Sequence, residues 1–111
     1  MSPSLFILVR KEALRMLENR FKTRLCRKLR SLFPGCVILH PSPNETQGIP
    51  DLIVLYNDRW AALEGKRSPT AAHRPNQQYY VEKMNRMSFA AFIYPENEEE
   101  VLHGLQQTFG P

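Results

Sequence analysis

A predicted β-hairpin in the middle of the chain is the sequence feature that most limits its fold. The apolar runs 52–56 and 60–63 are separated by a short turn, Asn57-Asp58-Arg59. Two such runs joined by turn-forming residues are typical of antiparallel strands. In an antiparallel pair the start of the first strand lies beside the end of the second. Asp51 and Glu64 are therefore predicted to meet at one edge of a sheet.

The residues at this edge have the chemistry of a divalent-metal site. Asp51 follows the tripeptide Gly-Ile-Pro, and Glu64 is followed by Gly65 and Lys66. Magnesium prefers oxygen ligands, usually one or two carboxylates together with waters and substrate phosphate. Glu64 and Lys66 are two apart on an extended segment, so both side chains leave the same face of the sheet. Gly65 is expected to mark a bulge or a close approach, and its carbonyl is a candidate metal ligand.

Hydrophobic periodicity predicts the elements on both sides of the hairpin. Apolar residues at three- and four-residue spacing from Leu14 to Leu32 indicate an amphipathic helix over 11–33. The remaining pattern predicts a strand over 36–39, a helix over 75–87 with Pro75 in its first turn, a strand over 89–94 and a closing helix over 98–109. This order is that of an α/β protein, and 111 residues are enough for a single domain, 1–111.

Two polar residues fall on the predicted sheet-facing sides of these helices. Glu18 shares the apolar stripe of the first helix, where an unpaired carboxylate is costly unless a cation lies nearby. Gln77 begins the sheet-facing stripe of the next helix, from which its side chain can reach Glu64 and Lys66. Both are therefore candidate site residues.

The segments Gly48-Ile49-Pro50-Asp51 and Glu64-Gly65-Lys66, followed by Gln77, resemble the motif of the PD-(D/E)XK nuclease superfamily, in particular its virus-type replication-repair (VRR-NUC) branch. The likeness covers most of the chain, because the predicted element order matches as well. The resemblance implies a restriction-endonuclease-like, three-layer α-β-β-β-α-β core with a closing C-terminal helix. Gly65 departs from the pattern, since an apolar β-branched residue is more typical at that position.

The resemblance also assigns roles to individual residues. It implies that Asp51 and Glu64 bind Mg²⁺ or Mn²⁺, with Glu18 as the accessory glutamate that the family often carries on its first helix. Lys66 is implied to position or activate the attacking water, and Gln77 to support the geometry of the metal site.

Basic residues are concentrated in the first third of the chain. Nine lysines and arginines lie between residues 10 and 30, against two glutamates. A basic helix beside an acidic metal site suits a polyanionic substrate, whereas the simpler interpretation is a solvated helix face. For a histidine in a loop, solvation is likewise the simpler interpretation. The candidate nucleic-acid contacts are Arg20, Arg24, Arg27, Lys28, Arg30, Arg67, His73 and Arg74.

These features predict a magnesium-dependent endonuclease that hydrolyses phosphodiester bonds in DNA. By resemblance, flapped, branched or Holliday-junction DNA is a candidate substrate, and a symmetric homodimer would suit junctions with two scissile strands. The alternative is a non-catalytic nucleic-acid-binding module of a replication, repair or packaging complex. A purely structural interaction protein would leave the acidic residues unexplained.

The cysteines and the apolar segments predict the cellular setting. Cys26 and Cys36 have neither the spacing of a zinc site nor the number needed for a disulfide framework. The apolar run 5–9 is far too short for a transmembrane helix and makes a poor signal peptide. We therefore expect an intracellular, cytoplasmic protein without a membrane partner, and the resemblance to the nuclease family implies a viral or bacterial source.

Overall fold

The computed structural model describes residues 2–110, which form three helices and four strands. In chain order the elements are α1 (Pro3–Leu32), β1 (Val37–Leu39), β2 (Leu52–Tyr56), β3 (Arg59–Gly65), α2 (Gln77–Met87), β4 (Phe89–Ile93) and α3 (Glu98–Phe109). The element order predicted from the sequence is confirmed, and the chain is an α/β domain.

The four strands form one mixed sheet in the order β1-β2-β3-β4. β2 pairs antiparallel with β1 and β3, whereas β3 and β4 are parallel and are connected through α2. The hairpin turn is shorter than predicted, because Arg59 already pairs with Tyr56. Asn57 adopts a left-handed φ of 55°, as tight two-residue turns require. The register Leu52↔Leu63 brings the residue before β2 to the end of β3.

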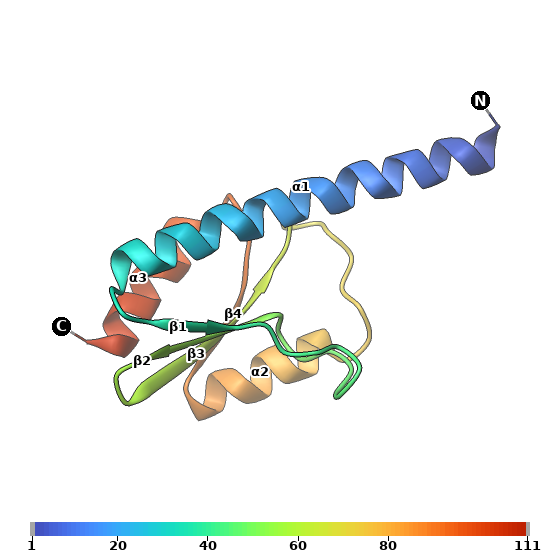
Figure 1. Ribbon diagram of the computed structural model, residues 1–111. Coiled ribbons are helices and arrows are strands. Elements are labelled where there is room, and N and C mark those ends of the chain that lie inside the picture. The colour runs from blue at the N-terminus through green and yellow to red at the C-terminus, as the bar shows by residue number, and fades with distance from the viewer. Residues whose placement is uncertain (1, 111) are drawn as a thin grey trace.

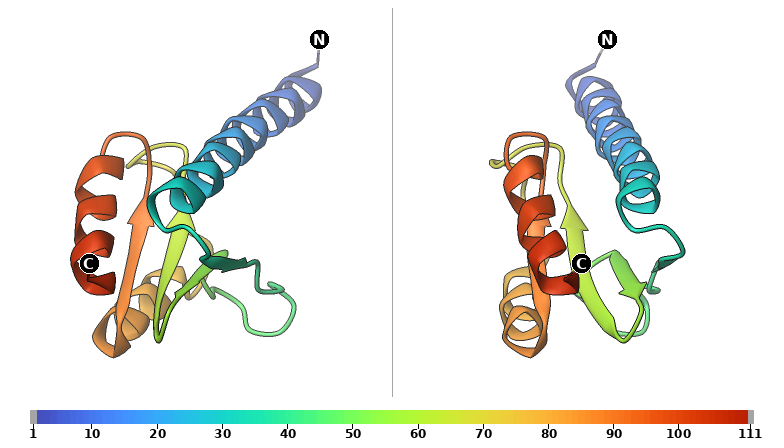
Figure 2. Two further views of the ribbon diagram at one scale, coloured as in Figure 1. Left: turned by 60° about the vertical axis from the view of Figure 1, so that its left-hand side comes forward. Right: turned by 90° about the vertical axis from the view of Figure 1, so that its left-hand side faces the viewer.

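Helices cover both faces of the sheet, which gives three layers (Figures 1 and 2). The larger core joins α1 and α3 to one face, and its buried side chains include Phe21, Leu25, Leu29, Leu52, Val54, Leu63, Ile93 and Leu105. On the other face the smaller core joins Val81 of α2 to Ala62 and Ala90. The alternation of Ala61, Ala62 and Leu63 between the two cores follows from the two-residue period of a strand.

α1 begins at Pro3, well before the predicted start at residue 11. The Ser2 side chain caps the helix by accepting a hydrogen bond from the Leu5 amide at 3.1 Å, and proline is favoured in a first turn. Phe6 is 57% exposed and Leu8 62% exposed. Figure 2 shows this end of α1 projecting beyond the sheet. Hydrophobic periodicity did not predict this segment, because such a pattern arises where one face of a helix is buried. These residues are exposed and bury no face.

Two leucines of the predicted apolar stripe also lie outside the core. Leu17 is 52% exposed and Leu32 is 36% exposed, so the predicted stripe of α1 is buried mainly at Phe21, Leu25 and Leu29. Each helix among residues 2–110 is too short or too polar to span a bilayer.

α2 begins at Gln77, so Pro75 precedes the helix and does not form its first turn as predicted. Asn76 is the N-terminal cap residue and has a left-handed φ of 69°. The loop before β2 packs tightly here, because a Cβ on Gly48 would lie 2.6 Å from the Asn76 carbonyl carbon. Gly48 also has a φ of +93°, which glycine adopts without strain. This contact joins the loop to α2 just before Asp51.

Candidate functional site

Glu64, near the end of β3, is a fully buried carboxylate. Neither of its oxygens has a hydrogen-bond partner within residues 2–110. Burial, followed by the nearby charge of Asp51, raises the pKa of Glu64 to about 7, although Lys22 and Lys66 oppose the shift. A buried polar group without a partner costs about 1–3 kcal/mol, and more when charged. The site therefore needs a proton or a cation at Glu64.

Asp51 lies beside Glu64 at the edge of the sheet, as the hairpin predicted. Its Oδ1 accepts a hydrogen bond from the Gly65 amide at 3.3 Å, and its Oδ2 pairs with the ammonium of Lys22. About a quarter of its side chain, 24%, is exposed. Asp51 thus connects the buried Glu64 to the solvent-accessible edge.

Lys66 is buried next to α2 and is held by uncharged acceptors. Its Nζ donates to Gln77 Oε1 at 2.9 Å and to the Ala72 carbonyl at 3.2 Å, and it lies 4.0 Å from Glu64 Oε2. Burial lowers the pKa of Lys66 even though Glu64 acts in the opposite direction. The predicted reach of Gln77 to Lys66 is confirmed, whereas no hydrogen bond joins Gln77 to Glu64 among the described residues.

Gln77 is fixed by backbone contacts as well as by Lys66. Its side-chain oxygen Oε1 also accepts a hydrogen bond from the Arg74 backbone amide at 2.8 Å. The backbone amide of Gln77 donates in turn to the Arg74 carbonyl at 3.2 Å. These two bonds at the start of α2 set the direction of the side chain. Gln77 Nε2 is buried and has no partner within the described part of the chain. The side-chain oxygen of Gln77 therefore has two donors, whereas the side-chain nitrogen has no acceptor among the described residues.

Lys22, on α1, also reaches the site, and the sequence analysis did not single it out. Its Nζ pairs with Asp51 Oδ2 and lies 3.5 Å from Glu18 Oε2. Burial alone would lower the pKa of Lys22, but Asp51, and then Glu18 and Glu64, more than offset that effect and raise it. The available signal was its position four residues after Glu18, on the side of the helix that carries the buried Leu25.

Gly65 allows Lys22 to pass close to β3. A Cβ at position 65 would lie 2.8 Å from Lys22 Cγ and 3.1 Å from its Cε. Gly65 pairs regularly with Ile93, so the strand has no bulge at this position, and of the two expectations for this glycine the close approach is the one observed. The absent side chain thus makes room for a lysine from another element.

The remaining predicted metal ligand, Glu18, contacts Lys22. Within residues 2–110 no three His, Cys, Asp or Glu side chains are arranged as a metal-binding group. Magnesium needs only one or two carboxylates when waters and phosphate complete its shell. The two free oxygens of Glu64, beside Asp51, fit such an ion.

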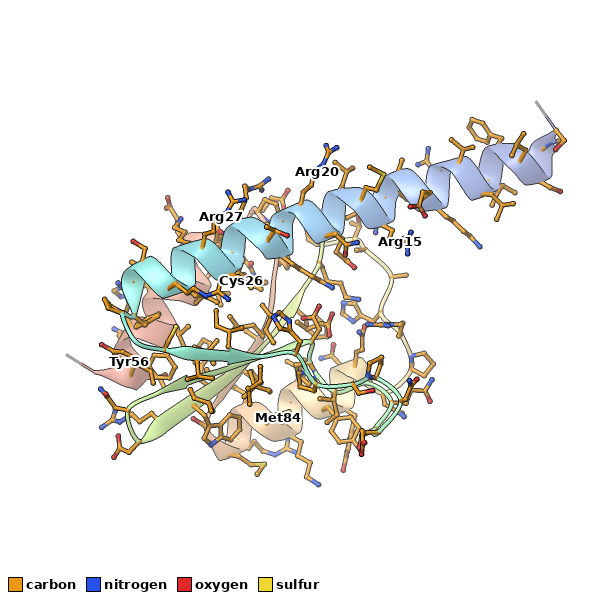
Figure 3. All side chains as sticks on the ribbon, viewed as in Figure 1. Arg15, Arg20, Cys26, Arg27, Tyr56 and Met84 are labelled. Atoms are coloured by element: carbon orange, nitrogen blue, oxygen red, sulfur yellow. The ribbon has the colours of Figure 1, made fainter. Side chains whose placement is uncertain are left out.

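The predicted nucleic-acid contacts of α1 are divided between its sides. Arg20 and Arg27 point away from the sheet in Figure 3, and the spacing of Arg24 places it on the same side. A hollow of about 420 Å³ beside α1 is lined by Arg20, Arg24 and Arg67, among others. Arg30 lines a different hollow, together with Lys22 and Arg27. The arginines of α1 therefore border two different hollows.

The other three predicted contacts have partners or lie closer to the site. Lys28 is 3.7 Å from Glu98 at the start of α3, so part of its charge is compensated. The ring of His73 stacks on Phe92 with 4.0 Å between centroids. Arg74 is close enough to Glu64 to lower its pKa. Of these three, Arg74 is the best placed to act on a ligand at the carboxylates.

Comparisons of the chain with protein-family models, with curated proteins and with solved structures give no match. The resemblance to a nuclease superfamily therefore rests on residues of the site and on the element order. The site itself combines two adjacent carboxylates with a buried lysine whose position is set by a glutamine.

Proposed function

We propose that the protein is a metal-dependent endonuclease of the PD-(D/E)XK type, with the restriction-endonuclease-like core that this implies. The observation that carries the proposal is the buried carboxylate of Glu64, whose two oxygens lack partners beside Asp51. A divalent cation has the charge and the preference for oxygen that this place requires. Asp51 and Glu64 would hold Mg²⁺ or Mn²⁺, with the Gly65 carbonyl and Glu18 as further candidate ligands.

The protein's own residues provide the remaining chemistry of phosphodiester hydrolysis. When bound, the ion supplies Lewis-acid chemistry, which polarises phosphate and makes water more acidic. Lys66 Nζ is held in place by Gln77 Oε1 and the Ala72 carbonyl. A fixed Nζ can orient the attacking water and stabilise the negative charge that develops on the phosphate. Gln77 thus acts by positioning Lys66.

Arginines outside the site provide a sequence-independent grip on DNA in this proposal. Arg20, Arg24 and Arg27 are exposed and form no salt bridge with any described residue. Contacts to phosphate position a protein on nucleic acid without reading its sequence. Arg67 lines a hollow together with Arg20 and Arg24, and Arg74 is close enough to Glu64 to lower its pKa. Flapped, branched or junction DNA is the substrate class that the resemblance favours, with a homodimer acting on junctions in the cytoplasm of a bacterial or infected cell.

A non-catalytic nucleic-acid-binding module is the second candidate function. Lys22 favours it, because this ammonium compensates Asp51 and Glu18 without any metal ion. Glu64 argues against it, because a module that only binds has no use for a buried carboxylate without partners.

A cleavage assay separates the two candidates. The purified protein is incubated with labelled flap, junction, duplex and single-stranded DNA in Mg²⁺, in Mn²⁺ and in EDTA. We expect nicking with either metal and none in EDTA, and loss of cutting in Asp51→Asn and Glu64→Gln. Asp58→Asn, in the exposed hairpin turn, is the matched control. Wild-type protein that binds these DNAs but cuts none of them, nor RNA, would establish the binding module instead.

A further inference from the structure

The ammonium of Lys22 contacts carboxylates of the site, although the proposed hydrolysis gives Lys22 no role. Its Nζ pairs with Asp51 Oδ2 and lies 3.5 Å from Glu18 Oε2, and only 20% of its side chain is exposed. Glu64 also acts on Lys22, since its charge contributes to raising the Lys22 pKa. The Lys22 ammonium thus acts on all three carboxylates, and Lys66 and Arg74 act on Glu64 in addition.

The strand beside Lys22 is shaped to admit its side chain. Any side chain at position 65 would meet the Lys22 stem, because a Cβ there would lie within 2.8 Å of Cγ. Gly65 is buried and its backbone is in regular register with β4, so neither a turn nor a bulge explains the glycine. The close approach of Lys22 does explain it.

We propose that Lys22 is the internal cation of this cluster and that a divalent ion competes with its ammonium for Asp51. The inference rests on the proposed metal site. Two cations cannot share one carboxylate oxygen at bonding distance without strong repulsion, because their charges then lie only a few ångströms apart, where the Coulomb energy is large even at the dielectric of a protein surface. The ion therefore binds only as Lys22 moves away from Asp51.

This competition has two opposite consequences for the protein. Without metal, Lys22 reduces the repulsion between Asp51 and Glu64 and so stabilises the fold. With metal, the same ammonium must be displaced, so it weakens the affinity for the ion. Removing the charge should therefore lower the stability of the metal-free protein and strengthen metal binding, a pair of effects that a purely structural lysine would not produce.

The test is a titration with Mn²⁺ by calorimetry, combined with thermal unfolding in EDTA. Lys22→Met keeps a long apolar stem and removes the charge, and we expect it to bind Mn²⁺ about tenfold more tightly and to melt at a lower temperature. Gly65→Ala keeps the charge but pushes the Lys22 stem away from the strand. We expect this variant, like Lys22→Met, to bind Mn²⁺ more tightly than wild type. Lys11→Met, on the exposed part of α1, is the control and should match wild type in both measurements.

The outcomes distinguish this inference from the function on which it rests. Wild type and Lys22→Met with equal Mn²⁺ affinity, or weaker binding by the variant, would overturn the competition alone. Should Lys22→Met fail to fold, Gly65→Ala decides by the same criterion. If no variant and no wild-type protein binds Mn²⁺, the metal site and the competition both fail.

Discussion

The two lysines that reach the carboxylates have opposite surroundings. Lys22 comes from α1, has 20% of its side chain exposed and pairs with Asp51. Lys66 comes from the end of β3, has 5% of its side chain exposed and is hydrogen-bonded to the uncharged carboxamide of Gln77. Burial acts to lower both pKa values, yet the pKa of Lys22 is raised because Asp51, Glu18 and Glu64 together more than offset burial, whereas that of Lys66 is lowered. The partner, and not depth alone, decides how a lysine behaves.

This difference divides two tasks between the lysines. Lys22 is a charge that compensates other charges, and its effect should appear in metal affinity and stability. Lys66 is held by neutral groups next to Glu64, and its effect should appear in the chemical step. The following variants test that division, beginning with the largest expected effect.

Lys66→Met should produce the largest change. Because its ammonium acts on the water and on the developing charge, we expect DNA cleavage to fall about 10²–10³-fold. Affinity for Mn²⁺ and for DNA should stay within about twofold of wild type, since the carboxylates and arginines are unchanged. Single-turnover cleavage rates measure the loss, with Lys83→Met on the exposed face of α2 as the control. A Lys66→Met protein that cuts at the wild-type rate would remove Lys66 from the mechanism.

Glu64→Gln should change how stability depends on pH. The pKa of Glu64 is raised from 4.5 to about 7 in the folded protein, so its contribution to stability is fully present below pH 4.5 and is lost as the pH rises through 7. Between pH 4 and pH 8, wild type should therefore lose up to about 3 kcal/mol of unfolding free energy relative to Glu64→Gln. Denaturant unfolding in EDTA measures this difference. Glu96→Gln, an exposed control, should follow wild type, and parallel curves for Glu64→Gln would contradict the burial argument.

Gln77→Leu tests whether Lys66 depends on its neutral partner. The variant removes the acceptor at 2.9 Å from Lys66 Nζ, and we expect cleavage to fall about tenfold to hundredfold with Mn²⁺ affinity unchanged. Gln78→Leu is the matched control, because Gln78 bonds to Glu82 on the exposed side of α2. If Mn²⁺ affinity fell together with cleavage, Gln77 would act on the metal site and not through Lys66.

Replacing arginines of α1 should have the smallest effect. We expect it to change DNA affinity and not the rate of the chemical step. Replacing Arg24, Arg27 and Arg30 with alanine should flatten the dependence of log K on log salt by roughly 0.9 for each phosphate contact that is lost. Fluorescence titrations at several salt concentrations measure the slope, with Arg86→Ala as the control. An unchanged slope would show that DNA is held elsewhere, for example at Arg67.

The sequence was sufficient to predict those contacts of the site that depend on a single turn or a single helix. The hairpin places Asp51 beside Glu64 through its own register, because a tight turn fixes which residues are paired. The period of α2 places Gln77 on the sheet-facing side, from which it reaches Lys66. Each of these contacts depends on one turn or one helix.

The sequence was insufficient where a contact joins distant elements or where packing is missing. The position of Lys22 depends on how α1 crosses the sheet, and neither the helical pattern nor Gly65 alone specifies that crossing. Periodicity also gave no signal for the first turns of α1, because Phe6 and its neighbours are helical without burying a face. Helix propagation from a packed segment and the Ser2 cap are sufficient there.

The most direct test of the central claim is the position of a bound ion. Crystals of the protein soaked in Mn²⁺ would give an anomalous difference map that locates the metal without assumptions about activity. We predict a peak in contact with a carboxylate oxygen of both Asp51 and Glu64, and no peak there in Glu64→Gln crystals treated in the same way. A manganese peak elsewhere in the wild-type protein, with this edge of the sheet empty, would contradict the account.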